Sequence, residues 1–197
     1  MDNVPQLGDA LPLTATDPAW LAVALDDLDS VHADHLHCER KAAQSALSLI
    51  RSYPDRGDLV TAMARLAHDE TRHVVQVSGL MRDRGQPAAY DFGDDYAKAL
   101  RDHIRTKEPE RLLDRLLVFA VIEARSAERL DLLARALPDE RARGLYASLA
   151  TAEVRHRDTF LALARDAAPD GWRGRAAELA QREAEILADR TPTARIH

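Results

Sequence analysis

The spacing of apolar residues along this chain is helical almost throughout. Apolar positions recur every three or four residues, so that they fall on one face of an α-helix. Asp17 and Pro18 give a strong start signal, because a capping aspartate precedes a proline at the first helical position. The first segment has a weak point near residues 26–30. The pattern predicts four long helices, at residues 18–52, 58–84, 109–137 and 138–166.

Proline and glycine mark the connections between these segments. SYPDRGD at 52–58 is a tight connection, after which we expect Asp58 to cap the second helix. Pro138 follows a very short turn and is expected to start the fourth helix. A long connection separates the two pairs and is expected to hold a short helix at 96–106. A terminal helix is predicted at 175–189.

Two short connections and one long one are the layout of a ferritin-like bundle. We therefore predict an all-α, ferritin-like four-helix bundle with one long crossover and extra terminal helices. The whole chain, 1–197, is expected to form a single domain, with an N-terminal arm at 1–15 and a C-terminal tail at 190–197.

Composition narrows the class of protein further. Aromatic residues make up only 5% of the chain, while Ala, Leu, Arg, Asp and Glu are abundant, as in all-helical proteins. Net charge is −6, so the chain as a whole does not attract phosphate or anionic lipid. Cys38 is the only cysteine, which excludes an internal disulfide and a zinc or iron–sulfur site built from thiolates. Without a signal peptide or a long apolar run, we expect a cytoplasmic protein with no membrane partner.

A weak internal repeat points to the chemistry. ERKAAQSAL from Glu39 resembles EARSAERLDL from Glu123, and LAHDETRH resembles LATAEVRH. Glu70 lies 31 residues after Glu39, and Glu153 lies 30 residues after Glu123. Each half thus supplies one glutamate and, on its next helix, a Glu-x-x-His pair, whose two members share a helix face. The chain has no other Glu-x-x-His, and both copies stand at repeat-equivalent places.

Four carboxylates and two imidazoles are the ligand set of a pair of first-row metal ions, with iron the first expectation. Two ferrous ions would cancel the four negative charges, which makes such a cluster tolerable in a core. We expect two bridging glutamates, Glu70 and Glu153, two terminal glutamates, and one histidine on each iron. The predicted ligands are Glu39, Glu70, His73, Glu123, Glu153 and His156.

Several neighbours are candidates for supporting these ligands. His35 lies four residues before Glu39 on the same face, and Asp69 could orient a ligand histidine. Arg72 and Arg155 precede the two ligand histidines symmetrically and could pair with carboxylates around the site. Each of these residues could instead have an ordinary packing or solvated role. We expect His32 and His37 at the surface.

Basic residues gather in the crossover stretch RDHIRTKEPERLLDR at 101–115. This stretch is the best candidate for an edge that faces phosphates. The alternative is an ordinary helix laced with salt bridges.

The quoted segments also carry a family resemblance. HADHLHCERKAAQSALSLIRSYP, LAHDETRHVVQV, FAVIEARSAERLDLLA and the terminal ARIH resemble the MiaE family of tRNA hydroxylases, from about Trp20 to the tail. The resemblance implies a non-haem di-iron monooxygenase that hydroxylates the isopentenyl group of 2-methylthio-N6-isopentenyladenosine in tRNA. It also implies O2 as co-substrate and the same six metal ligands.

Because no flavin or nicotinamide motif is present, an external ferredoxin or reductase must supply the electrons. We expect a monomer. Two other functions use the same ligand set. One is a di-iron oxygenase that acts on a small-molecule metabolite, and the other is a ferritin-like protein that handles iron or oxidants.

Overall fold

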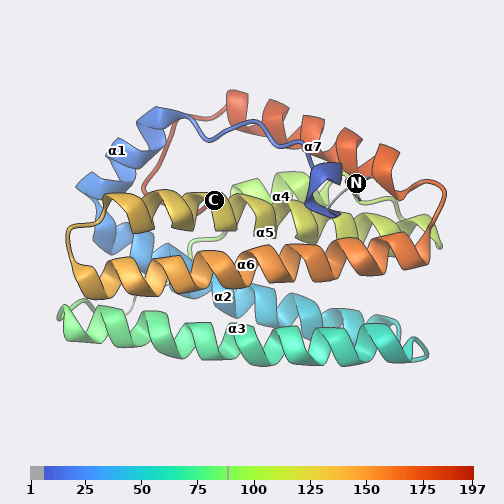
Figure 1. Ribbon diagram of the computed structural model, residues 1–197, viewed down its shortest axis with the longest axis horizontal. Coiled ribbons are helices and arrows are strands. Elements are labelled where there is room, and N and C mark those ends of the chain that lie inside the picture. The colour runs from blue at the N-terminus through green and yellow to red at the C-terminus, as the bar shows by residue number, and fades with distance from the viewer. Residues whose placement is uncertain (1–6, 88) are drawn as a thin grey trace, which may run out of the picture.

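The structure, a computed structural model, describes residues 7–87 and 89–197 (Figure 1). Residues 1–6 of the predicted N-terminal arm lie outside the described residues. The described residues form helices and contain no β-strand. These helices are η1 (Leu7–Ala10), α1 (Pro18–Asp26), α2 (Leu28–Ser52), α3 (Gly57–Asp83), α4 (Asp95–Arg101), α5 (Glu110–Ala136), α6 (Glu140–Ala167) and α7 (Trp172–Ala188).

The four long helices form two hairpins, α2 with α3 and α5 with α6, joined by the long crossover that contains α4 (Figure 1). The hairpins approach each other most closely along α3 and α6, so that the side between α2 and α5 is more widely spaced. Helices α4 and α7 pack on α5 as an additional layer. This arrangement confirms the prediction of an all-α, ferritin-like bundle with one long crossover.

Most predicted helix boundaries hold within a few residues, and the exceptions have local causes. The break near residues 26–30 is real, because α1 ends at Asp26 and Asp27 caps α2 through Ser30 N. Asp58 was expected to cap α3, but α3 begins at Gly57 and no side chain caps it. Helix α6 begins at Glu140 rather than at Pro138, because the Asp139 carboxylate accepts a hydrogen bond from Ala142 N at 2.7 Å.

Two predicted ends need larger corrections. Helix α4 ends at Arg101 instead of residue 106, because the backbone N–H of Arg105 donates to the buried Asp114 carboxylate at 2.9 Å, outside the helical pattern. Helix α7 begins at Trp172, three residues earlier than predicted. Trp172 is 3% exposed, so burial of its ring in the core holds the first turn in place.

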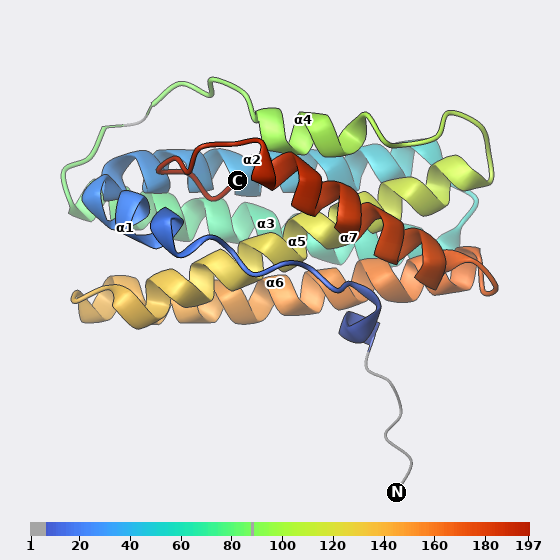
Figure 2. The same ribbon diagram turned by 90° about the horizontal axis from the view of Figure 1, so that it is seen from above.

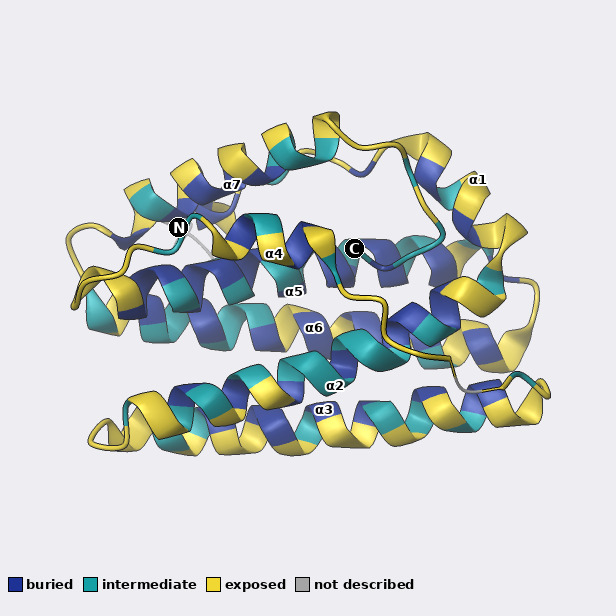
Figure 3. Cartoon of the chain, turned by 180° about the vertical axis from the view of Figure 1, so that it is seen from behind, coloured by how far each residue is buried: buried dark blue, intermediate teal, exposed yellow. Residues whose placement is uncertain are grey.

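Two apolar clusters fill the bundle, one toward each end. The cluster nearer the α2–α3 connection includes Leu49, Met63 and Leu116. The cluster at the opposite end includes Trp20 and Tyr146. Figure 3 shows the buried stripes of the long helices facing inward, with exposed residues on the outer faces. Between the two clusters lies a layer where the inward positions are polar.

A buried ion pair fixes α7 and the N-terminal segment on α5. Arg125, which is fully buried, donates hydrogen bonds to the two carboxylate oxygens of Glu183 at 2.7 and 2.9 Å. The same guanidinium donates to Thr14 O and Thr16 Oγ1, and the Tyr96 hydroxyl donates to Glu183 at 3.1 Å. Loss of Arg125 would leave the Glu183 carboxylate buried without its cationic partner, so this ion pair is important for the stability of the fold.

The C-terminal tail, 190–197, runs from α7 back across the bundle toward α2 (Figure 2). Arg195 forms an ion pair with Asp34 of α2 at 2.7 Å, and the backbone N–H of Ile196 donates to the same carboxylate at 2.8 Å. Ile196 is fully buried in the second apolar cluster. Among the described residues, the helices are all too short or too polar to cross a membrane.

Candidate metal centre

The six residues selected from the repeat meet in the polar layer between the two apolar clusters. They come from the middle of the four long helices, and none is more than 5% exposed. Both halves of the repeat therefore deliver their glutamate and histidine side chains to one level of the bundle. In chain order they are Glu39 on α2, Glu70 and His73 on α3, Glu123 on α5, and Glu153 and His156 on α6.

The His73 imidazole faces three of the four carboxylates. Its Nδ1 lies 3.2 Å from Glu39 Oε2, 3.3 Å from Glu70 Oε2 and 3.6 Å from Glu153 Oε1. Glu70 and His73 are neighbours on one turn of α3, while Glu39 reaches them from the adjacent helix. Glu39 and Glu70 therefore lie at the same level of the first hairpin.

The His156 imidazole repeats this arrangement in the second half. Its Nδ1 lies 2.9 Å from Glu70 Oε1 and 3.0 Å from Glu153 Oε2. The ring centroids of His73 and His156 are 5.7 Å apart. Each histidine therefore presents Nδ1 to the carboxylate layer, and the two rings flank it.

The donor atoms form two overlapping groups. One contains Glu39, Glu70, His73 and Glu153, and in it the ligand atoms all lie within 4.8 Å of one another. The other contains Glu123 and His156 together with the same Glu70 and Glu153. Two ligand sets that share two carboxylates are the arrangement that a pair of metal ions with two bridging glutamates requires.

The electrostatics of the layer favour bound positive charge. Burial raises the pKa of Glu123 well above its usual value, and the neighbouring Glu153 and Glu70 raise it further. Burial would lower the pKa of His73 and His156, but the carboxylates beside them raise both values to about 10. Glu123 and the two histidines thus retain protons, because uncompensated like charges in a core repel one another, whereas the pKa of Glu39 is lowered to about 2. Bound metal cations would also offset the repulsion between the carboxylates, and they would displace these protons.

Several buried polar atoms of the layer also lack a hydrogen-bond partner in the described structure. They are Glu153 Oε1, His156 Nε2 and, beside the layer, His35 Nδ1. Unpaired buried oxygens are costly in a core, and metal ligation is one way to satisfy them. The donor set and these atoms together fit a carboxylate-bridged metal pair and indicate a metal centre.

Two of the expected supporting residues lie where they can act on the ligands. His35 is 1% exposed, and its Nε2 lies 2.6 Å from Glu39 Oε1. Asp69 Oδ2 lies 3.8 Å from His156 Nε2, the ring nitrogen that faces away from the carboxylates. The first contact is a hydrogen bond that can hold Glu39 in one orientation, whereas the second is longer than a hydrogen bond and acts on His156 through charge alone.

The expectation that the two symmetric arginines pair with carboxylates around the site holds for Arg72 and is wrong for Arg155. Arg155 is exposed and forms no ion pair within the described part of the chain. Arg72 pairs with Asp69 at 3.1 Å, so it reaches the centre only through that carboxylate. Both residues immediately precede a buried histidine on their helix, and the rotation of about 100° per residue turns their side chains toward solvent.

The sequence interpretation also missed two residues beside the centre. His32, expected at the surface, is 1% exposed, and its Nδ1 lies 3.1 Å from Gln86 Oε1. Tyr146 of α6 stacks on His35 at 5.6 Å between ring centroids and on His32 at 6.1 Å. The available signal was spacing, since His32 lies three residues before His35 and shares its helix face.

Comparisons with known proteins agree with this geometry. A family model described as tRNA-(MS[2]IO[6]A)-hydroxylase (MiaE) matches residues 6–197. A Pseudomonas putida protein named tRNA 2-(methylsulfanyl)-N(6)-isopentenyladenosine(37) hydroxylase is 38% identical, with 100% of this chain and 96% of that protein covered. A Salmonella typhimurium protein of the same name is 31% identical over 87% of this chain and 82% of its own length.

A solved structure is similar as well. It is described as protein 43 with aldehyde deformylating oxygenase activity from Synechococcus. It superimposes with a TM-score of 0.88 at 35% sequence identity, covering 95% of this chain and 94% of that one. The match extends over the helices that carry the six residues.

Proposed function

Since the chain belongs to the MiaE family of tRNA hydroxylases, we propose that it hydroxylates the isopentenyl group of 2-methylthio-N6-isopentenyladenosine in tRNA, using O2. Two curated relatives carry this activity in their names, and one of them aligns with the whole chain. The observation that carries the proposal is the buried layer of four glutamates and two histidines from the four long helices.

The proposed cofactor is a pair of iron ions held by these six residues. Glu39 and His73 would bind one ion, and Glu123 and His156 the other, with Glu70 and Glu153 shared. Bound there, the iron pair would supply the redox chemistry that activates O2. The overlap of the two ligand groups supports this assignment of bridging and terminal roles.

The protein's own part is to orient the ligands and to exclude water. His35 holds Glu39 through the 2.6 Å contact to Oε1, which leaves Oε2 facing the centre. Asp69 lies beside the outer nitrogen of His156 and favours a proton at Nε2, so that Nδ1 offers its lone pair. Burial of the whole layer keeps bulk water from the reacting groups.

A basic groove on the wider side of the bundle, between α2 and α5, is the proposed tRNA contact. A cavity of about 580 Å³ there is lined by residues of α2, α5 and the crossover, and an adjoining cavity of about 340 Å³ shares four of those residues. We call the two together the basic groove, and its cationic residues are Lys41, Arg51, Arg101, Arg105, Arg111 and Arg115.

The cations of the basic groove are not equally available. Arg105 is paired with Asp114 at 2.8 Å, and Lys41 lies 3.5 Å from an aspartate, Asp91. In contrast, Arg51, Arg101 and Arg111 are exposed and form no ion pair within the described residues. Unpaired arginines in a concave surface bind phosphate oxygens well, because the guanidinium offers a planar pair of donors. The acidic net charge of the chain is thus no obstacle to local binding of RNA.

The basic groove ends close to the metal centre along the helix axes. Lys41 is two residues from Glu39 on α2, and Phe119 is four residues from Glu123 on α5. At about 1.5 Å rise per residue, both lie within about 6 Å of the ligand layer along the bundle. A tRNA backbone held in the groove would therefore bring a nearby nucleoside to the level of the centre.

The remaining partners follow from the chemistry. Insertion of one oxygen atom of O2 into a C–H bond needs two electrons, and we propose that an external ferredoxin or reductase supplies them. We further propose a cytoplasmic monomer, where substrate tRNA is available. Size-exclusion chromatography tests the oligomeric state and would reveal a cage if the protein stored iron.

The decisive experiment supplies purified protein with iron, a chemical reductant, O2 and tRNA that carries the prenylated nucleoside. Nucleoside mass spectrometry should detect the gain of one oxygen atom in that nucleoside. A Glu123→Ala variant, which lacks one proposed iron ligand, should give none. An unchanged nucleoside with iron-loaded wild-type protein would contradict the tRNA assignment.

A second candidate function is oxidation of a small molecule, and the similar Synechococcus structure favours it specifically. The name of that protein includes aldehyde deformylating oxygenase activity, at 35% identity to this chain. Incubation of the iron-loaded protein with an aldehyde, reductant and O2 separates the two. Turnover of aldehyde together with no change in tRNA would support this second function.

A further inference from the structure

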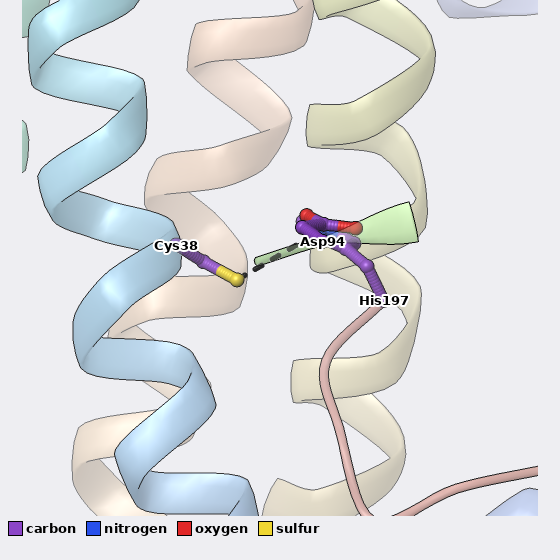
Figure 4. A group of neighbouring side chains, drawn as sticks. All are labelled: Cys38, Asp94 and His197. Atoms are coloured by element: carbon purple, nitrogen blue, oxygen red, sulfur yellow. Dashed lines mark hydrogen bonds and ion pairs between the residues drawn. The ribbon is translucent and has the colours of Figure 1, made fainter. Parts of the chain in front are cut away.

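A second group of potential metal ligands lies outside the carboxylate layer, where the C-terminal tail meets α2 and the start of α4. Its members are Cys38 on α2, Asp94 immediately before α4, and His197 at the end of the tail (Figure 4). Figure 4 shows the three side chains pointing toward one another from three separate segments. One sulfur, one oxygen and one nitrogen donor all lie within 4.8 Å of one another.

The two separations that involve His197 fit the edges of a metal-centred tetrahedron. His197 Nδ1 lies 3.5 Å from Cys38 Sγ and 3.4 Å from Asp94 Oδ2. With ordinary zinc–sulfur, zinc–nitrogen and zinc–oxygen bond lengths, the corresponding edges are about 3.6 Å and about 3.4 Å. The nitrogen–oxygen separation is too long for a good hydrogen bond, for which about 2.9 Å is usual.

Two of the ligands, His197 and Asp94, are also held by a second contact that leaves the donor atom facing the cluster. His197 Nε2 lies 2.8 Å from the Ser126 hydroxyl, so Nδ1 can carry the free lone pair. Asp94 Oδ1 accepts the capping hydrogen bond from Ala97 N at 2.9 Å, which leaves Oδ2 toward His197. A hydrogen bond from the outer ring nitrogen is the usual support of a metal-bound histidine.

The surrounding residues hold these side chains in position and shield them from water. The His197 side chain is 4% exposed and that of Asp94 is 7% exposed. The tail that carries His197 is fixed by the ion pair between Arg195 and Asp34 and by the buried Ile196. A thiolate, a carboxylate and a neutral imidazole together carry two negative charges, so that one divalent cation makes the site neutral.

We propose that Cys38, Asp94 and His197 bind a single Zn²⁺ ion, separate from the iron pair. Binding would replace the thiol proton of Cys38 by a zinc–sulfur bond and release that proton to solvent. Three protein donors leave one tetrahedral position for water or another small ligand. The mixed donor set differs from the sites built from thiolates, which a single cysteine excludes. The site is independent of the proposed function and requires neither iron nor tRNA.

Cobalt substitution gives a test that the iron site cannot imitate. Co²⁺ added to the full chain should produce a sulfur-to-cobalt charge-transfer band in the near ultraviolet. Because Cys38 is the only cysteine, that band can come only from this residue. Cobalt bound to the glutamate and histidine layer has no sulfur ligand and cannot give the band.

Three variants and a matched control complete the experiment. The band should vanish in Cys38→Ser, and Asp94→Asn and His197→Gln should weaken cobalt binding by at least the roughly 10- to 100-fold that loss of an outer partner costs. Asp94→Asn keeps the side-chain oxygen that caps α4, so this variant should fold normally. It therefore still tests the site if His197→Gln changes the conformation of the tail. Asp95→Asn makes the same change one residue along the chain and should retain the band.

Metal analysis after zinc loading gives a second readout, in which Cys38→Ser should hold one zinc fewer per chain than the wild type. Absence of the charge-transfer band in the wild type would overturn the proposal. A band that persists unchanged in both Asp94→Asn and His197→Gln would also overturn it, because Cys38 would then bind metal without these partners. Far-ultraviolet circular dichroism of each variant confirms the helical fold under the same conditions.

Discussion

Removal of the three unpaired arginines of the basic groove tests how the protein holds its proposed RNA substrate. Arg51, Arg101 and Arg111 are exposed, line the groove and have no ion-pair partner among the described residues. The variant with all three changed to glutamine keeps side chains of similar length and removes three positive charges. None of the three side chains supports the core, so the fold should be unaffected.

The expected loss of affinity follows from counterion release. Each phosphate contact contributes about 0.7 to 0.9 to the slope of log K against log salt concentration, so three contacts contribute about 2.1 to 2.7. If the electrostatic contribution vanishes near about 1 M salt, their loss at about 0.15 M weakens binding by roughly 50- to 150-fold. The salt slope should fall by the same 2.1 to 2.7, approximately.

The assay is fluorescence anisotropy of a labelled anticodon stem–loop RNA, titrated with protein at several salt concentrations. The matched control changes three exposed arginines at the opposite end of the bundle, Arg82, Arg135 and Arg141, to glutamine. Both triple variants shift the net charge from −6 to −9, so a general charge effect would appear in both. Equal loss of binding in the two variants, or an unchanged salt slope in the groove variant, would refute a specific phosphate groove.

Three further predictions concern the centre and the core. Glu70→Ala should abolish binding of both irons, because Glu70 belongs to both ligand groups, whereas Glu39→Ala should leave the second group intact. Iron analysis after reconstitution measures this difference. Two irons per chain in Glu70→Ala would contradict the bridging role of Glu70. His35→Ala should weaken iron binding by roughly 10- to 100-fold in chelator competition, because it removes the partner of Glu39. Glu183→Gln should lower the free energy of unfolding by about 1.5 to 3 kcal/mol in urea titrations, since it removes the charge-assisted hydrogen bonds of the buried Arg125 to Glu183 and leaves only its ion pair with Glu128.

The prediction for Glu183 has a matched control in the chain. Glu185→Gln lies on the same helix as Glu183 but removes an exposed pair with Arg182, so its cost should stay below about 1 kcal/mol. If Glu183→Gln also lowered the free energy of unfolding by less than about 1 kcal/mol, the buried ion pair would not contribute to stability. For His35, an unchanged chelator competition curve would limit its role to packing against Tyr146.

The sequence by itself determined the helices and the six residues of the candidate centre. Helical periodicity is a local property, and a Glu-x-x-His pair shares a face wherever the helix packs. The repeat also places Glu39 level with Glu70, because about the same number of residues separates each of them from the short connection at 52–58 between their helices. These conclusions depend only on spacing along one or two helices.

The tertiary structure alone decided what lies around that centre. His32 is buried because Tyr146, far away in the chain, stacks on it, and Arg155 is exposed because of its direction on a packed helix. Cys38 and His197 are 159 residues apart and meet because the tail is anchored back on α2. Contacts of this kind depend on how helices and tail pack in three dimensions, which no local pattern of residues encodes.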